Sequence, residues 1–179
     1  MKHPKPTVKD GKGKMTPVGS GAYIARTSTA FLDAYDGQNL LPPNFFGSTS
    51  RNTNTPDITV DLVGGKFTVS NSGWYSLNAS ISTDPDTAAL PSDRFAFTLY
   101  RNGAVEQWGD DLSTCESDGV TTYLVRSFSG HWVIYLAAGD YVQLGYNAKL
   151  VQGGKSFFTG EATGVRTYFN IALVNRSLA

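Results

Sequence analysis

The sequence predicts an all-β fold, a sandwich or a barrel, and three observations support this class. Short runs of alternating apolar and polar residues recur about every 8–12 residues, as in sandwiches and barrels. Nineteen glycines, nine tyrosines and ten phenylalanines suit short strands joined by tight turns. No window shows helical periodicity beyond one turn. With 179 residues and 40% hydrophobic content, the chain can bury one sizeable core.

In the first half of the chain, turn residues separate the expected strands clearly. Residues 31–57 are expected to be a long connection or an interrupted strand pair, because apolar clusters there alternate with glycine, proline and a polar run. Gly64-Gly65 turns the chain between two alternating runs, and Gly73 opens a third. The expected strands, each an alternating run bounded by turn residues, are 22–27, 58–62, 67–69 and 74–81.

The second half contains the strongest hairpin signal, Asn102-Gly103, which lies between an apolar strand and a return strand that begins at Val105 and includes Trp108. Residues 84–91 are expected to be a loop, and residues 109–119 an acidic loop. Besides the return strand, the strands expected here are 95–99, 121–128, 132–136, 142–146, 157–158 and 167–174.

The period of two along each strand separates core residues from outward residues. The expected core includes Phe67, Tyr75, Phe97, Leu136, Val142 and Phe169. Four aromatic side chains are expected to point away from it: Trp74, Tyr100, Tyr135 and Tyr168. A single exposed aromatic residue means little, but several on one sheet indicate a covered face. The alternative is an ordinary sandwich with scattered surface aromatics.

Two hairpins carry a resemblance to a known superfamily. In the first, Gly65-x-Phe67 opens one strand and Gly73-x-Tyr75 opens the next. In the second, the order Leu-x-x-Gly-Asp-x-Val-x-Leu is present over 136–144. Together with Asn102-Gly103 and an apolar closing strand, these motifs resemble the complement 1q / tumour-necrosis-factor superfamily over roughly residues 20–175. The 179 residues contain no collagen repeat and no membrane anchor of the tumour-necrosis type, and we expect the protein to have neither.

The resemblance implies a jelly-roll β-sandwich that assembles as a homotrimer, with one sheet facing the threefold axis. It therefore implies that the outward aromatics Trp74, Tyr100, Tyr135 and Tyr168 form the trimer interface. The expected organisation is an extended basic arm over residues 1–20 and a jelly-roll domain over 21–179.

The first twenty residues have a charge opposite to that of the rest. The lysines Lys2, Lys5, Lys9, Lys12 and Lys14 stand against a single acidic residue, Asp10, which gives a net charge of +4. Because the whole chain is neutral, the remainder carries −4. A basic arm on an acidic body is typical of a segment that docks onto a partner, so these lysines are predicted to anchor the protein. No global positive field favours nucleic acid or a membrane.

The sequence offers little catalytic or metal-binding chemistry. His3 and His131 have no partner at metal-ligand spacing, and Cys115 is the single cysteine, so an intrachain disulfide is excluded. Four acidic residues form a cluster, Asp110, Asp111, Glu116 and Asp118, for which a solvated loop is favoured over a calcium site. The phosphate-binding pattern Gly-x-x-x-x-Gly-Lys is absent. The prediction is therefore a protein that is not an enzyme and needs no cofactor or metal.

These observations favour a structural protein of a virion. The start of the sequence has no apolar stretch typical of a signal peptide, which leads us to expect synthesis in a host cytoplasm and residence in the virion. The preferred function is a trimeric bacteriophage capsid decoration protein whose arm contacts other virion proteins such as the major capsid protein. The alternative is a tail-tip or fibre module that binds a receptor or a carbohydrate through exposed Trp and Tyr side chains.

Overall fold

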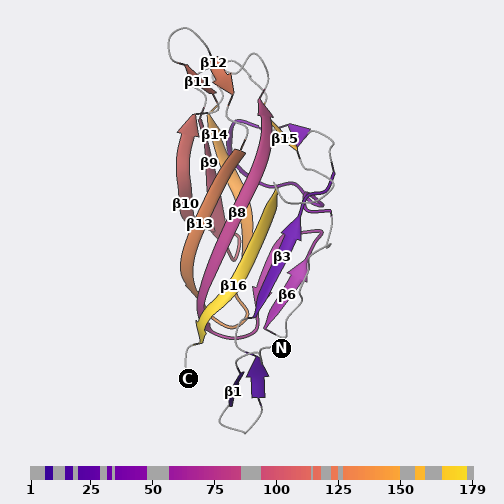
Figure 1. Ribbon diagram of the computed structural model, residues 1–179, viewed down its shortest axis with the longest axis vertical. Helices are drawn as coiled ribbons and strands as arrows, with labels where there is room; N and C mark the ends of the chain where they lie inside the picture. The colour runs from indigo at the N-terminus through magenta and orange to yellow at the C-terminus, as the bar shows by residue number, and fades with distance from the viewer. Residues whose placement is uncertain are drawn as a thin grey trace, which may run out of the picture.

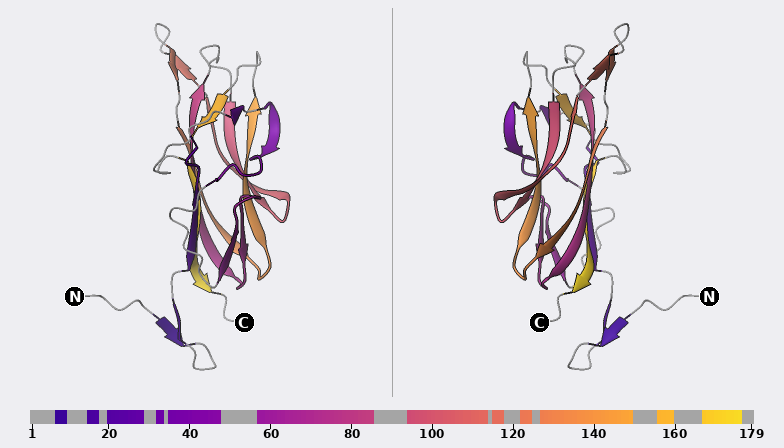
Figure 2. Two further views of the ribbon diagram at one scale, coloured as in Figure 1. Left: turned by 90° about the vertical axis from the view of Figure 1, so that its right-hand side faces the viewer. Right: turned by 90° about the vertical axis from the view of Figure 1, so that its left-hand side faces the viewer.

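Two antiparallel sheets packed face to face make up the body of the protein in the computed structural model (Figures 1 and 2). The structure describes residues 7–9, 15–17, 20–28, 32–33, 35–47, 57–85, 94–113, 115–117, 122–124, 127–149, 156–159 and 167–176. These residues form strands and turns with no helix, so none of them forms a helix long and apolar enough to cross a membrane. The predicted all-β class and jelly-roll sandwich are confirmed.

The first sheet, sheet I, has six strands and forms the rear layer in Figure 1. Its order is β10-β9-β14-β7-β6, and β5 also pairs with β14. The strands are β5 (Gly37–Leu40), β6 (Ile58–Asp61), β7 (Lys66–Val69), β9 (Arg94–Arg101), β10 (Ala104–Ser113) and β14 (Tyr141–Lys149).

The second sheet, sheet II, also has six strands and faces the viewer in Figure 1. Its order is β3-β16-β8-β15-β4, and β13 pairs with the other side of β8. The strands are β3 (Gly21–Ala25), β4 (Leu32–Asp33), β8 (Gly73–Pro85), β13 (Ser127–Leu136), β15 (Ser156–Thr159) and β16 (Tyr168–Arg176). Two separate pairs complete the described strands: β1 (Thr7–Lys9) with β2 (Met15–Pro17), and β11 (Cys115–Ser117) with β12 (Thr122–Leu124).

Aromatic side chains fill the space between the sheets, as their alternation predicts. All six expected core residues are buried: Phe67, Tyr75, Phe97, Leu136, Val142 and Phe169. Phe67 of sheet I meets Phe169 of sheet II with ring centroids 4.9 Å apart. Each such side chain contributes about 1.5–3 kcal/mol by leaving water, so this layer is the main source of stability.

The edge where β10 approaches β13 is closed by Trp132, which is buried between two glycines. A Cβ atom on Gly130 would come within 2.8 Å of Trp132 Cζ2, and one on Gly109 would lie 3.5 Å from the same atom. The indole ring also lies edge-on to Phe97, with 6.4 Å between ring centroids. The absence of side chains at these two positions therefore makes room for the large ring that seals this side of the sandwich.

The prediction that the two motifs form hairpins is wrong, because β7 and β14 belong to sheet I whereas β8 and β13 belong to sheet II, so each motif connects the two sheets. The Gly-Asp motif of the second connection has a structural role, because Asp140 joins two neighbouring turns. Its carboxylate accepts hydrogen bonds from Arg101 Nε at 3.0 Å, Asn102 Nδ2 at 2.7 Å and the Ala137 amide at 2.8 Å. Burial alone raises the pKa of Asp140, but these hydrogen bonds and the Arg101 charge hold it below its ordinary value. Asn102 and Gly103 both have positive φ, as the predicted two-residue turn requires.

Several element boundaries differ from those expected. Residues 31–57 contain two short strands, β4 and β5, so this segment is not a plain connection, but the two strands do not pair with each other: β4 pairs with β15 in sheet II and β5 with β14 in sheet I. The prediction of an acidic loop over 109–119 is wrong in part, because β10 continues to Ser113 and β11 spans Cys115–Ser117. The reason lies in β9, whose backbone pairs with β10 back to Arg94, and a register shift between Trp108 and Asp111 accommodates the polar sequence. Similarly, β8 extends to Pro85, two residues into the predicted loop.

The described part of the arm is a small hairpin outside both sheets. β1 and β2 pair with the register Thr7↔Pro17, and they lie beyond the lower end of the sandwich in Figure 1. Lys9 is the last residue of β1, whereas Lys2, Lys5, Lys12 and Lys14 lie outside the described residues. The division into an arm and a jelly-roll domain stays a prediction.

Candidate interaction surface

The outer surface of β3, β8, β13 and β16 carries no charged residue among the positions whose side chains the structure describes. Successive residues of a strand point to opposite sides, so the residues between the core positions of β3, β8, β13 and β16 form one continuous surface. We call this surface the uncharged face. Its residues are Gly21, Tyr23, Ala25, Trp74, Ser76, Asn78, Ser80, Ser82, Ser127, Ser129, His131, Val133, Tyr135, Tyr168, Asn170, Ala172, Val174 and Asn175.

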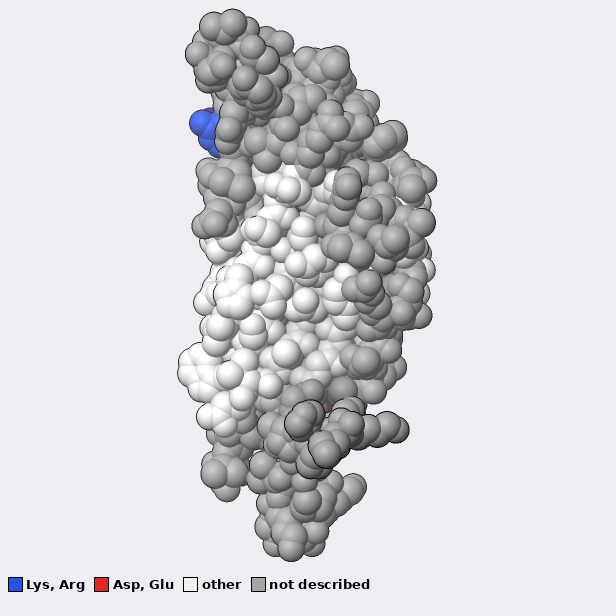
Figure 3. Space-filling model, in the orientation of Figure 1, with Lys and Arg blue, Asp and Glu red and all other residues white. Residues whose placement is uncertain are grey.

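Figure 3 looks directly onto this surface. The described atoms from β13 across to β3 are white, and the blue of a basic side chain appears only at the upper left margin. Surfaces that remain in water usually mix charged and polar residues. An extended surface without charge is therefore the clearest departure from an ordinary soluble exterior in the described part of the chain.

Large apolar side chains gather at the lower end of the uncharged face. Trp74 is 49% exposed and Tyr135 39% exposed, and their rings meet edge to face with centroids 5.9 Å apart. Val133 and Val174 are also exposed, on the neighbouring strands β13 and β16. Four exposed apolar residues on adjacent strands form a patch of the kind that marks an interaction site.

Three of the four aromatic residues predicted to form an interface lie together on this face. Trp74, Tyr135 and Tyr168 come from β8, β13 and β16, in line with the expectation that these side chains point outward. Tyr168 is half-buried and stacks on Tyr23 with ring centroids 5.4 Å apart. Whether these residues touch another copy of the chain stays a prediction.

The expectation that Tyr100 shares an exposed face with the other three is wrong. Tyr100 belongs to β9 in sheet I and is only 8% exposed. Its ring covers Gly145 on the neighbouring strand β14, where a Cβ atom would lie 3.1 Å from Tyr100 Cδ2. The alternation correctly turns Tyr100 away from the inter-sheet core, but it cannot tell to which of the two sheets an outward residue belongs.

A row of hydrogen-bonded polar side chains crosses the middle of the uncharged face. His131, Asn78 and Asn170 are direct cross-strand neighbours on β13, β8 and β16. His131 Nδ1 lies 2.5 Å from Asn78 Oδ1, and Asn78 Nδ2 donates to Asn170 Oδ1 at 3.1 Å. We call these three residues the polar row. The alternation along the expected strand 74–81 puts Asn78 on the same side as Trp74, but it does not predict the contact with His131.

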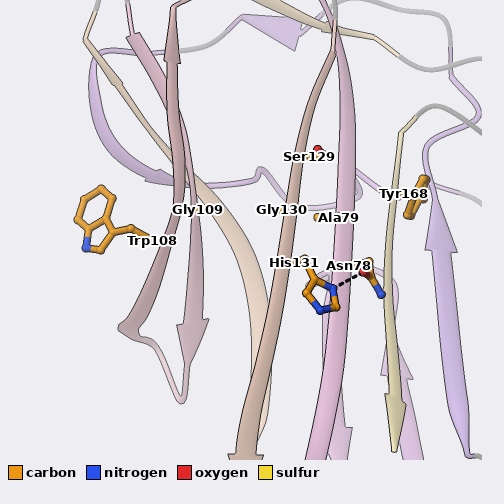
Figure 4. Close-up of a pocket in the computed structure, with 8 residues that line it drawn as sticks. All are labelled: Asn78, Ala79, Trp108, Gly109, Ser129, Gly130, His131 and Tyr168. Atoms are coloured by element: carbon orange, nitrogen blue, oxygen red, sulfur yellow. Dashed lines mark hydrogen bonds between the residues drawn. The ribbon is translucent and has the colours of Figure 1, made fainter. Parts of the chain in front are cut away.

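Beside the polar row lies a depression of about 370 Å³. Small residues of β8 and β13, including Ala79, Ser129 and Gly130, line it, and the ring of Tyr168 stands at one side (Figure 4). Figure 4 also shows the Trp108 side chain pointing away from the other lining residues on the far side of β10. The depression thus has uncharged hydrogen-bonding groups and one aromatic wall.

The described residues contain no group of three or more His, Cys, Asp or Glu that could hold a metal ion. The structure describes little of the predicted acidic cluster. Asp118 is outside the described residues, and Asp110, Asp111 and Glu116 are described only as parts of β10 and β11. His3 is likewise outside the described residues, and Cys115 is described only as the first residue of β11.

Comparisons with known proteins bear on the fold. No family model matches the sequence, and no curated protein matches it. The structure of Eiger TNF from S. frugiperda resembles this chain with a TM-score of 0.52 at 15% identity, covering 90% of this chain and 96% of that chain. The fold is a tumour-necrosis-factor-like jelly roll. The crystal structure of rabbit GITRL is more distant, with a TM-score of 0.40 at 16% identity, covering 68% of this chain and 81% of that chain.

Proposed function

We propose that this protein is a non-enzymatic structural protein of a virion, a trimeric bacteriophage capsid decoration protein that its N-terminal arm anchors. The observation that carries the proposal is the uncharged face of sheet II. It supports an assembly role, because covering the residues of this face requires none of their described side chains to lose a charge from water.

Covering the uncharged face costs free energy if charges lose water, and it gains free energy if apolar area is buried. Burying an unpaired charge is expensive, whereas burying apolar area stabilises by about 25 cal/mol per Å². The uncharged face has no described charge to desolvate, and it presents Trp74, Val133, Tyr135 and Val174 to a partner. A second copy of the same chain brings a surface of the same character, so the proposed occupant is the protein itself. The threefold arrangement follows from the superfamily resemblance.

The anchoring role of the arm rests on charge. The arm carries +4 and the remainder of the chain −4, so the arm is the part suited to an acidic partner surface. Lys2, Lys5, Lys9, Lys12 and Lys14 supply this charge, and a trimer would present three such arms. Single exposed ion pairs are worth roughly 0–1 kcal/mol, so attachment depends on many contacts acting together. The proposed partner is the major capsid protein, and the proposed location is the virion.

The test of self-association is light scattering on the intact chain, with an interface variant and a matched control. We expect a mass of three chains for the parent, each of 19.3 kDa. Trp74→Asp places a charge in the proposed interface and should shift the protein toward monomer. Val63→Asp makes the same change at an exposed valine between β6 and β7, outside the uncharged face, and should leave the mass unchanged. A parent that is monomeric at micromolar concentration contradicts the proposal.

A second candidate function, carbohydrate binding, is favoured by the depression. Its hydroxyl, amide and imidazole groups, with the ring of Tyr168 at one side, suit an uncharged polyhydroxylated ligand. The two functions compete for the same surface, because a trimer that covers the uncharged face would also cover the depression. Calorimetry with neutral oligosaccharides on the parent and on Tyr168→Ala distinguishes them: binding that Tyr168→Ala abolishes, in a monomeric protein, would favour the second function.

A further inference from the structure

The polar row lies at the centre of the uncharged face. On β13 the outward residues run Ser127, Ser129, His131, Val133 and Tyr135, so His131 occupies the third of five positions. Below it lies the apolar patch with Trp74, and above it lie serines. A partner that covers the apolar patch and continues across the face must also cover His131.

The hydrogen bonds of the polar row determine which nitrogen of His131 carries the proton. Asn78 donates its amide N–H to Asn170, so its oxygen faces His131. A contact of 2.5 Å between that oxygen and Nδ1 requires the hydrogen on Nδ1. The other ring nitrogen, Nε2, is the one that the polar row does not engage.

No described group facing His131 could compensate a positive charge. On its own strand its outward neighbours are Ser129 and Val133, and β8 presents Ser76, Asn78 and Ser80. From β16 come Tyr168, Asn170 and Ala172, and β3 adds Tyr23. None of these residues is an aspartate or a glutamate.

The described charged residue on β10, the nearest strand of sheet I, does not supply a counter-charge to His131 either. β10 approaches β13, and the charged residue whose side chain is described there, Glu106, lies 3.6 Å from Arg101 and is paired with it. The Asp140 carboxylate at the turn after β13 is also paired with Arg101, at 2.8 Å. The described carboxylates closest along these strands are therefore engaged by an arginine.

We propose that His131 makes self-association of this protein conditional on a neutral imidazole, so that mild acid separates the subunits. The inference rests on the proposed trimer and specifies how that same surface is regulated. When copies cover the uncharged face, protonation of each His131 would place an imidazolium in a desolvated surface without a described counter-charge. Three such charges around a threefold axis would also repel one another.

The test measures the mass and the dissociation of the intact chain at pH 7.5 and at pH 5.0 by sedimentation velocity. For the parent we expect trimers at pH 7.5 and a dissociation midpoint that is at least about tenfold higher in concentration at pH 5.0, since histidine changes its charge in this interval. Circular dichroism at pH 5.0 should retain the β spectrum, because the change concerns the surface and not the core.

Two variants make the result specific. His131→Gln keeps an N–H donor for Asn78 but cannot become charged, so it should associate equally at both pH values. His3→Gln removes the other histidine of the chain and should remain acid-sensitive like the parent.

The outcomes separate this inference from the proposed function. A parent that is trimeric with equal affinity at both pH values overturns the inference and leaves the trimer intact, as does a His131→Gln protein that is still acid-sensitive. A parent that is already monomeric at pH 7.5 removes the proposed trimer itself, and with it the surface on which the inference depends.

Discussion

At the scale of single residues, Asp140 shows how a short sequence motif is explained by its contacts. The carboxylate is mostly buried and receives hydrogen bonds from Arg101, Asn102 and Ala137, which tie the β9–β10 turn to the β13–β14 turn. The aspartate of this motif thus fixes the β9–β10 hairpin relative to the connection from β13 in sheet II to β14 in sheet I. Nothing in the composition of the chain distinguishes this aspartate from those on the surface.

Replacing Asp140 with Asn should destabilise the protein by about 1–3 kcal/mol near neutral pH, because the ion pair with Arg101 is lost. The pKa of Asp140 is lowered in the folded state, so its stabilisation is present above the ordinary aspartate pKa and is lost as pH falls through the lower folded value. Urea unfolding at several pH values should therefore show the two proteins converging below about pH 4. A difference that stays constant from pH 7 to pH 3 would contradict this explanation.

Phe97 tests the inward register of β9. Its side chain is buried between Phe95 and Trp132, so Phe97→Ala should cost on the order of 3–5 kcal/mol of unfolding free energy. The control is Val63→Ala, which shortens an exposed apolar side chain and should change stability by less than about 0.5 kcal/mol. Equal denaturant midpoints for the two variants would show that Phe97 does not lie in the core.

At the scale of elements, the strand pairs are recognisable from the sequence wherever a period of two and a turn signal coincide. This was so for β6 with β7, which the Gly64-Gly65 turn joins, and for β9 with β10, where Asn102-Gly103 fixes the turn. β7 and β8, expected as a hairpin, lie in different sheets. The end of β10 could not be predicted in the same way. Its last residues are polar, and they form a strand because the backbone of β9 pairs with them. The contact of His131 with Asn78 also depends on which strands are neighbours, and pairing between distant segments cannot be deduced from alternation alone.

The junction of β10 and β13 gives a prediction at this scale. Gly130→Ala would place a methyl group against the Trp132 ring and should destabilise the protein by about 1–3 kcal/mol. It should also shift the emission of the buried Trp132 toward longer wavelength, as the ring is displaced toward solvent. Gly47→Ala is the matched control, since the atom nearest to its added Cβ is the Asn44 oxygen at 3.8 Å, an ordinary contact. Identical melting temperatures for the two variants would argue against the role of Trp132 in closing this edge.

At the scale of the whole molecule, the two sheets differ in what they present to their surroundings. Sheet II offers the uncharged face, whereas sheet I carries the charged pairs Lys66–Asp61 and Arg101–Glu106. The sequence predicted that outward aromatics would gather on one sheet, and three of the four do. It could not predict that charge is absent from the outer positions of β3, β8, β13 and β16 whose side chains the structure describes, because these positions are scattered over four strands.

The arm gives the prediction that belongs to this scale. Deleting residues 1–20 should leave a folded trimer that no longer joins the particle, because the jelly roll buries its core without the arm. Replacing Lys2, Lys5, Lys9, Lys12 and Lys14 with Gln should reduce occupancy while leaving the length of the arm unchanged. Occupancy is measured by gel densitometry of purified particles. Full occupancy by the truncated protein would refute the anchoring role, and a strongly salt-dependent shift of duplex DNA by the intact protein would assign the arm to phosphate binding.

The two ends of the sandwich differ in the segments that lie there. Gly21, the first residue of β3, lies opposite Ala172 in the middle of β16, and the β1–β2 hairpin lies beyond the lower end of the sandwich, the end at which β16 terminates in Figure 1. The β11–β12 pair lies at the other end. On an anchored particle, a peptide fused after the last strand would therefore emerge beside the shell and be hidden from antibodies. The same peptide inserted between β11 and β12 would stand at the outer tip, which makes that position the one to use for displaying an epitope.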